Sequence, residues 1–232
     1  MFSLNSLFSR KMTKLFDLCL LNVLCIITSL PVITMGASFT ALYTVLMAMS
    51  KDEEGPVTRM YINVFKSNFK KSSLAGVILL LIVAVLIVDL EIWNASGSEQ
   101  KPMFVTATFV LLAFVAMAAG WLFPLLAKFE NSLKNMYKNA FLFAMKYFPV
   151  SLSMGVVTIG YTMLLMEYFF TLWMPALFIG IIILAYPWSF YVRSRFEKYL
   201  EDLETAPSAG AASEKEFPAD GKIAAQEENT CV

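Results

Sequence analysis

Histidine is absent from this sequence, and charged residues are few. Of the 232 residues, 16% are charged and 58% are hydrophobic, and the formal net charge is zero. An ordinary soluble domain has roughly 25% charged residues. Without histidine the chain lacks the commonest general base and the commonest metal ligand. A neutral charge balance also gives no electrostatic reason to bind nucleic acid.

Cysteine is scarce as well, with Cys19 and Cys25 in a hydrophobic run and Cys231 close to the C-terminus. These cysteines form no C-x-x-C pair, so their spacing supports neither a disulfide framework nor a zinc site. The sequence also has no nucleophile–base pair and no phosphate-binding glycine loop, and the acidic run at residues 52–54 has no further ligands around it. We therefore expect no catalytic, cofactor-binding or metal-binding residues, and no enzyme.

Long uncharged stretches are the main feature of the sequence. They cover residues 18–50, 72–88, 102–127, 147–166 and 168–192. A membrane-spanning helix needs about 20 apolar residues, so each of the last four stretches fits one span. The first run continues well past the core of a signal peptide, which has about 7–15 residues, so a cleaved signal is not expected. The sequence predicts an all-α, polytopic membrane protein.

The first stretch is too long for one span, since as a single helix at about 1.5 Å per residue it would reach about 50 Å. Pro31 lies inside it. Proline favours the first turn of a helix and disfavours helical geometry in the residue before it. Two interpretations remain open. The stretch forms either two short spans, about 14–30 and 32–49, joined by a tight turn, or one long kinked helix.

Basic residues indicate the topology, because lysine and arginine are in excess in cytoplasmic loops. They flank the first stretch on both sides, at Arg10, Lys11 and Lys14 and again at Lys51, Arg59, Lys66, Lys70 and Lys71. This favours an even number of crossings there, and hence six transmembrane helices with both termini in the cytoplasm; five helices is the alternative. Trp93 and Trp173 fall at predicted outer ends, and Trp121 and Trp188 near inner ends, as in aromatic belts.

Two segments outside the spans are amphipathic, at residues 57–69 and 133–145. In each, apolar residues recur at helical spacing and basic residues lie off the apolar stripe, which predicts two interfacial helices on the cytoplasmic side. Such helices anchor to anionic lipid or dock a soluble partner. For docking, the candidate residues are Tyr61, Phe65, Phe69, Tyr137 and Phe141. The segments match at an offset of 76 residues, which indicates either a parallel internal repeat or a shared composition.

Polar residues near Pro31 are a second candidate site. Asn22, Ser29, Thr34 and Ser38 lie within the first stretch, among other small or hydroxylated residues. Such residues either let helices pack closely or line a substrate cavity at a helix break.

The C-terminal part of the sequence changes in composition. After a helical transmembrane domain of residues 1–200, residues 201–232 are rich in alanine, glutamate, serine and proline. Because such a segment can bury little apolar surface, we expect a disordered cytoplasmic tail.

Several short motifs of this sequence occur together in a known family of proteins. They are Ser29-Leu30-Pro31-Val32-Ile33-Thr34-Met35-Gly36 followed by Ala41-Leu42-Tyr43, then Asp52-Glu53-Glu54-Gly55, Phe65-Lys66-Ser67-Asn68-Phe69-Lys70 and Phe123-Pro124-Leu125-Leu126-Ala127. In these motifs the chain resembles the YesL-like family of bacterial integral membrane proteins of unknown function. The resemblance covers about residues 1–200 and leaves out the tail.

The resemblance implies a multi-pass protein of the bacterial cytoplasmic membrane that is linked to carbohydrate uptake and use. Family members tend to be encoded beside sugar importers, so it implies sugar importer subunits as partners in addition to the lipid bilayer. It transfers no catalytic or binding residues. We therefore expect a non-enzymatic accessory or permease-like component. The alternatives are a membrane-embedded regulatory or assembly protein with no transport path, and a small independent transporter.

Overall fold

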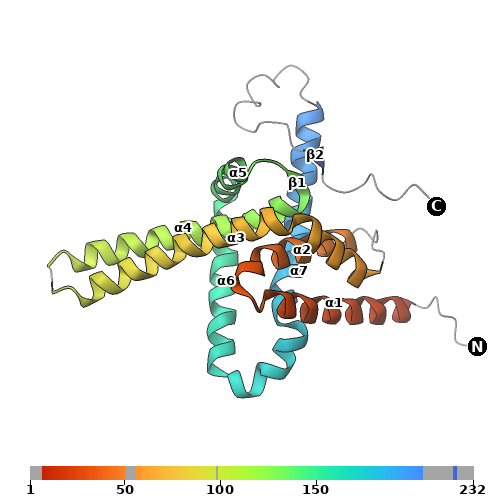
Figure 1. The fold of residues 1–232 in the computed structure, drawn as a ribbon, viewed down its shortest axis with the longest axis horizontal. Helices are drawn as coiled ribbons and strands as arrows, with labels where there is room; N and C mark the ends of the chain where they lie inside the picture. The colour runs from red at the N-terminus through yellow and green to blue at the C-terminus, as the bar shows by residue number, and fades with distance from the viewer. Residues whose placement is uncertain (1–6, 51–55, 98, 206–221, 224–232) are drawn as a thin grey trace, which may run out of the picture.

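The computed structural model describes residues 7–50, 56–97, 99–205 and 222–223, and nearly all of them are helical (Figure 1). In chain order the elements are α1 (Leu7–Ser29), the short 3-10 helix η1 (Val32–Thr34), α2 (Met35–Met49), α3 (Val57–Ala95), α4 (Lys101–Lys128), β1 (Phe129–Glu130), α5 (Leu133–Lys146), α6 (Phe148–Glu167), α7 (Phe169–Thr205) and β2 (Lys222–Ile223). The two short strands pair antiparallel. The predicted all-α class is confirmed.

Most of the predicted disordered tail, residues 206–221 and 224–232, lies outside the described residues. The same is true of residues 1–6 and of the acidic run at 52–54.

The first apolar stretch forms two helices rather than one kinked helix. Helix α1 ends at Ser29, and Pro31 adopts an extended conformation with φ −74° and ψ 121°. The chain then turns through η1, where the Thr34 backbone N–H donates to the Pro31 carbonyl oxygen at 2.9 Å. Lys14, near the start of α1, donates from Nζ to the Met49 carbonyl oxygen at 3.5 Å. The start of α1 and the end of α2 therefore lie side by side.

Several helices have the length and composition to cross a membrane. Among the described residues these are Met12–Ser29, Val32–Met49, Val57–Ala95 and Lys101–Lys128, and the bent pair α5–α6 would make a fifth. Large apolar side chains on α3 and α4 are exposed, including Leu81, Val85, Ile92, Met103 and Phe109. Such a surface is stable in lipid rather than in water. The chain is thus a helical membrane protein, but the predicted number of six spans is not confirmed.

The apolar helices do not form one parallel bundle. Helices α3 and α4 make a long hairpin, and α6 and α7 make a second hairpin that runs crosswise to it (Figure 1). One buried cluster joins α4, α5 and α7, and a second joins α1, α2, the first part of α3 and α7. Both hairpins thus emerge from a shared junction of packed helices.

The two predicted interfacial helices differ in structure. Residues 57–69 are the first part of the continuous helix α3, whereas residues 133–145 form a separate helix, α5, that meets α6 at a bend of 97°. Pro149 accounts for the bend, because proline lacks the N–H that would continue α5. The residue of α3 that corresponds to Pro149, 76 positions earlier, is Ser73, which allows the helix to continue. The prediction of two matched helices is therefore wrong, and the parallel repeat is not supported.

The tryptophans predicted near the inner ends of the spans lie in the core instead. Trp121 is fully buried and its indole N–H donates to Ser151 Oγ at 2.9 Å. Trp188 is nearly buried and donates to the Gly120 carbonyl oxygen at 2.9 Å. Their rings also contact each other, at 5.0 Å between centres. These two residues hold α4 against α7 and are not part of an aromatic belt.

Candidate functional site at the α1–α2 turn and the basic end of α7

Four hydroxyl side chains meet at the turn between α1 and α2. We call this group the polar junction: Thr28, Thr34, Ser38 and Tyr61. The Thr28 hydroxyl donates to the Leu24 carbonyl oxygen at 2.8 Å and accepts from Ser38 Oγ at 3.0 Å. Because its single proton is used for Leu24, the Tyr61 hydroxyl, 2.6 Å away, is the donor in the contact between the two.

Thr34 completes the polar junction. Its hydroxyl lies 2.5 Å from the Thr28 carbonyl oxygen and 2.7 Å from that of Pro31, two acceptors that the helix break leaves available. Ser38 and Tyr61 are fully buried. The hydroxyls of the junction therefore use one another and the backbone as partners, an arrangement that fixes the turn between α1 and α2.

The predicted polar cluster is only partly assembled. Thr34 and Ser38 meet in the polar junction, but Ser29 instead contacts Cys25, at 3.9 Å from Oγ to Sγ. Asn22 is fully buried and lies elsewhere, where its Oδ1 accepts from the backbone N–H groups of Ile181 at 3.0 Å and Ile182 at 3.3 Å. Asn22 therefore connects α1 to α7.

Helices α2 and α3 touch through their backbones. A Cβ atom added to Gly36 would lie 2.0 Å from the Ser72 carbonyl oxygen and 3.0 Å from the Gly76 Cα. Only glycine allows so close an approach at this point. Ser72 is almost fully buried, and its hydroxyl has no hydrogen-bond partner among the described residues.

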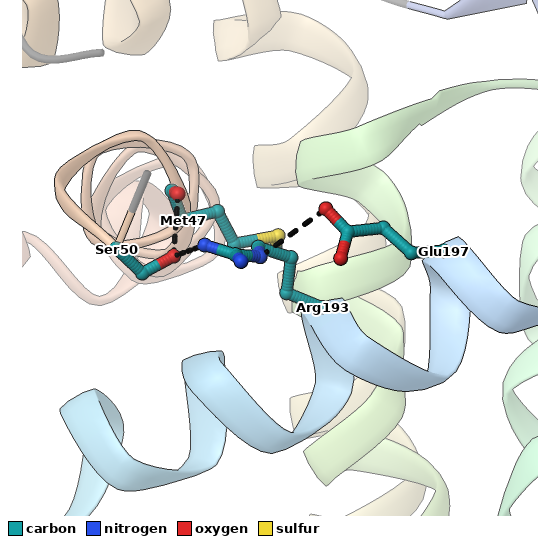
Figure 2. Close-up of polar contacts among 4 residues, drawn as sticks. All are labelled: Met47, Ser50, Arg193 and Glu197. Carbon is teal, nitrogen blue, oxygen red and sulfur yellow. Dashed lines mark hydrogen bonds and ion pairs between the residues drawn. The ribbon is translucent and has the colours of Figure 1, made fainter. Parts of the chain in front are cut away.

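A second polar group, the Arg193 cluster of Met47, Ser50, Arg193 and Glu197, connects α7 to the end of α2 (Figure 2). Arg193 Nη1 donates to Ser50 Oγ at 2.5 Å, and Ser50 Oγ donates to the Met47 carbonyl oxygen at 2.7 Å. Arg193 Nε pairs with Glu197 Oε1 at 3.3 Å. A cation at the C-terminus of α2 is stabilised by the helix dipole.

The predicted docking residues separate into buried and exposed ones. Tyr61 has no exposed surface, so it cannot contact a partner, and this part of the prediction is wrong. Tyr137 is half-buried and its hydroxyl donates to the Ala75 carbonyl oxygen at 2.5 Å. Phe65 is half-buried between the rings of Tyr61 and Phe69. Phe69 and Phe141 are 37% and 48% exposed.

Sequence reasoning missed Tyr61 and Arg193 as members of polar groups. Tyr61 was placed on an apolar stripe, and its hydroxyl gave no signal of the hydroxyl-rich turn that it meets. Arg193 directly follows the last uncharged stretch, where a basic residue is expected at a cytoplasmic end. The only signal for it was position, since Ser50 and Arg193 both come at the end of an uncharged stretch.

The fold and these contacts define a helical membrane protein in which polar side chains connect apolar helices. A family model described as "Protein of unknown function, DUF624" matches residues 18–90. The match covers less than half of the chain and contains the polar junction and the Gly36–Gly76 contact. It is consistent with the resemblance to the YesL-like family. No curated protein and no solved structure matches the chain.

Proposed function

We propose that this protein is a non-enzymatic accessory or permease-like component linked to carbohydrate uptake, with sugar importer subunits as partners. The resemblance to the YesL-like family supports the link to carbohydrate. The observation that carries the docking part is the exposure of Phe69 and Phe141 beside basic residues, Lys70 in α3 and Lys138 in α5. An exposed aromatic ring beside a cation suits the surface of a soluble or peripheral partner.

The orientation is part of the same proposal. Lys14, the end of α2 and Arg193 lie together at one end of the helices. Basic residues favour the cytoplasmic side, so we place this end, and with it both termini, in the cytoplasm of a bacterial cell.

The docking proposal is tested by growth on a complex carbohydrate. Phe69→Ala and Phe141→Ala are each expected to slow growth on this carbon source and not on glucose, at normal protein levels in the membrane. Phe109→Ala in α4 is the matched control, because its ring is 54% exposed on the apolar hairpin and should face lipid. Growth of both docking variants at the rate of the control would refute docking through these rings.

A second candidate function is that of a regulatory or assembly protein with no transport path. The observation in its favour is that the hydroxyls of the polar junction are bonded to one another and to the backbone. A pull-down in mild detergent separates the two functions. Recovery of importer subunits supports the accessory component, and its loss in Phe141→Ala would assign the contact to α5. The other alternative, a small independent transporter, depended mainly on the parallel repeat, which the structure does not support.

A further inference from the structure

The bend between α5 and α6 brings two cations to one aromatic ring. Lys146 Nζ lies 5.8 Å and Arg195 Cζ lies 5.3 Å from the centre of the Tyr147 ring. Lys146 ends α5, Tyr147 lies at the bend, and Arg195 comes from α7. Within the part of the chain that the structure describes, neither cation forms an ion pair. An anion within reach of both positive charges would be stabilised by each of them.

The chemistry of this site suits a phosphate group. Arginine presents a planar fork of N–H donors that binds phosphate in a bidentate manner, and lysine adds a compact positive charge. Arg195 Cζ also lies 4.9 Å from the centre of the Tyr191 ring. The Tyr191 hydroxyl is buried and has no hydrogen-bond partner among the described residues. The rings of Tyr147 and Tyr191 both lie close to the Arg195 guanidinium, which helps to fix its position.

Exposed apolar side chains beside the cations favour a lipid over a free phosphate. Met145 and Phe148 flank Lys146 and Tyr147 in the chain and are 44% and 40% exposed. From Phe148 onward α6 exposes further large apolar residues, including Leu152 and Val156. A cationic pair at the end of an amphipathic helix, directly followed by an apolar helix, corresponds to the level of headgroups above acyl chains.

We propose that Lys146, Tyr147 and Arg195 form a binding site for the phosphate headgroup of an anionic phospholipid, whose acyl chains lie against Met145 and Phe148. This site is independent of the proposed link to carbohydrate uptake. It also gives α5 a membrane contact that differs from general attraction to its lysines, because it uses a residue of α7.

The test measures binding of short-chain phosphatidylglycerol to the full-length protein in mild detergent by calorimetry. Short-chain phosphatidylcholine and inorganic phosphate are the comparison ligands. Arg195→Gln is expected to weaken phosphatidylglycerol binding about tenfold, because it removes charge-assisted hydrogen bonds to the headgroup. Arg59→Gln is the matched control, since Arg59 is exposed on α3 and the variant changes the net charge equally. Arg195→Lys keeps the charge and should lose less affinity than Arg195→Gln.

The calorimetric results either support or overturn the proposed phosphate site. Tighter binding of phosphatidylglycerol than of the other two ligands, lost in Arg195→Gln but not in Arg59→Gln, supports the site. Equal losses in the two variants would assign binding to overall charge and overturn it. Inorganic phosphate binding as tightly as phosphatidylglycerol would overturn the lipid assignment. The melting temperature of each variant is measured alongside, and Lys146→Gln replaces Arg195→Gln as the test if the latter unfolds.

Discussion

Single residues in this protein act mainly through close packing and internal hydrogen bonds. Asn22, Tyr61 and Trp121 are fully buried, and each has a polar partner on another helix. In a membrane, association of helices depends on close van der Waals contact and on such bonds, because lipid is as apolar as the side chains themselves. The Gly36–Gly76 contact is the tightest example, since backbone meets backbone there.

Gly36→Ala is expected to lower the stability of the protein by about 1–3 kcal/mol, because overpacking forces neighbouring backbone to move. The new Cβ would meet the carbonyl oxygen of Ser72, which cannot rotate away. Thermal unfolding in detergent measures the effect. Gly160→Ala in α6 is the control, because its Cβ would have nothing within 4 Å, and it should melt at or slightly above the wild-type temperature. Equal melting of the two variants would contradict the backbone contact.

For single residues, the sequence indicates which side chains are polar or aromatic, but not which other residues surround them in the fold. It places Thr34 and Ser38 in a polar cluster with Asn22 and Ser29, and in the structure Thr34 and Ser38 lie together beside Thr28 while the other two lie elsewhere. It could not predict that Tyr61 is buried or that Trp121 faces the core. Aromatic residues are suited both to a protein core and to a membrane interface, and only the packing of distant helices decides between these environments.

At the scale of elements, two of the helix breaks lie at prolines, whereas Pro124 lies inside α4 without ending it. Pro31 lies between α1 and α2, in agreement with one of the two interpretations that the sequence left open, and Pro149 lies at the bend between α5 and α6. The sequence predicts an interfacial helix at both 57–69 and 133–145 because their apolar stripes match, but only the second is separate from the helix that follows it. Those stripes are similar, but a stripe does not report whether the helix continues into the next span. The difference between Ser73 and Pro149 was the available signal.

The hydrogen bond between Ser50 of the α2 end and Arg193 of α7 should contribute a measurable coupling energy to stability. Ser50→Ala and Arg193→Gln each remove one side of the hydrogen bond, so a double-mutant cycle should give a coupling energy of about 1 kcal/mol in unfolding free energy. Arg193 is partly buried, with 19% of its side chain exposed, so the bond is screened less than a surface pair.

The control cycle pairs Ser50→Ala with Arg59→Gln, whose effects should add within about 0.5 kcal/mol because the Ser50 side chain bonds to Met47 and Arg193 and not to Arg59. A Ser50–Arg193 cycle that was equally additive would mean that Arg193 does not hold α7 to α2.

At the scale of the whole molecule, the two apolar hairpins extend from the same group of packed helices but run in different directions (Figure 1). Hydropathy and charge predict which segments are apolar and which ends are basic, and these properties are local. They do not predict the angle between hairpins, which depends on the contacts of α4, α5 and α7 around Trp121. For this reason the sequence could predict the class of protein but not the arrangement of the spans, and it left the helix break at Pro31 as one of two alternatives.

The central proposal is that α3 crosses the membrane, with its basic start in the cytoplasm and its far end, where it turns into α4, outside. Thiol labelling of intact cells tests this most directly, in a background with Cys19, Cys25 and Cys231 replaced by serine. Arg59 and Glu99 are both exposed and lie near the two ends of α3, so each is changed to cysteine. A membrane-permeant reagent should label both variants and shows that both thiols react. An impermeant reagent is expected to label Glu99→Cys in intact cells and Arg59→Cys only after permeabilisation; equal labelling of the two in intact cells would contradict the account.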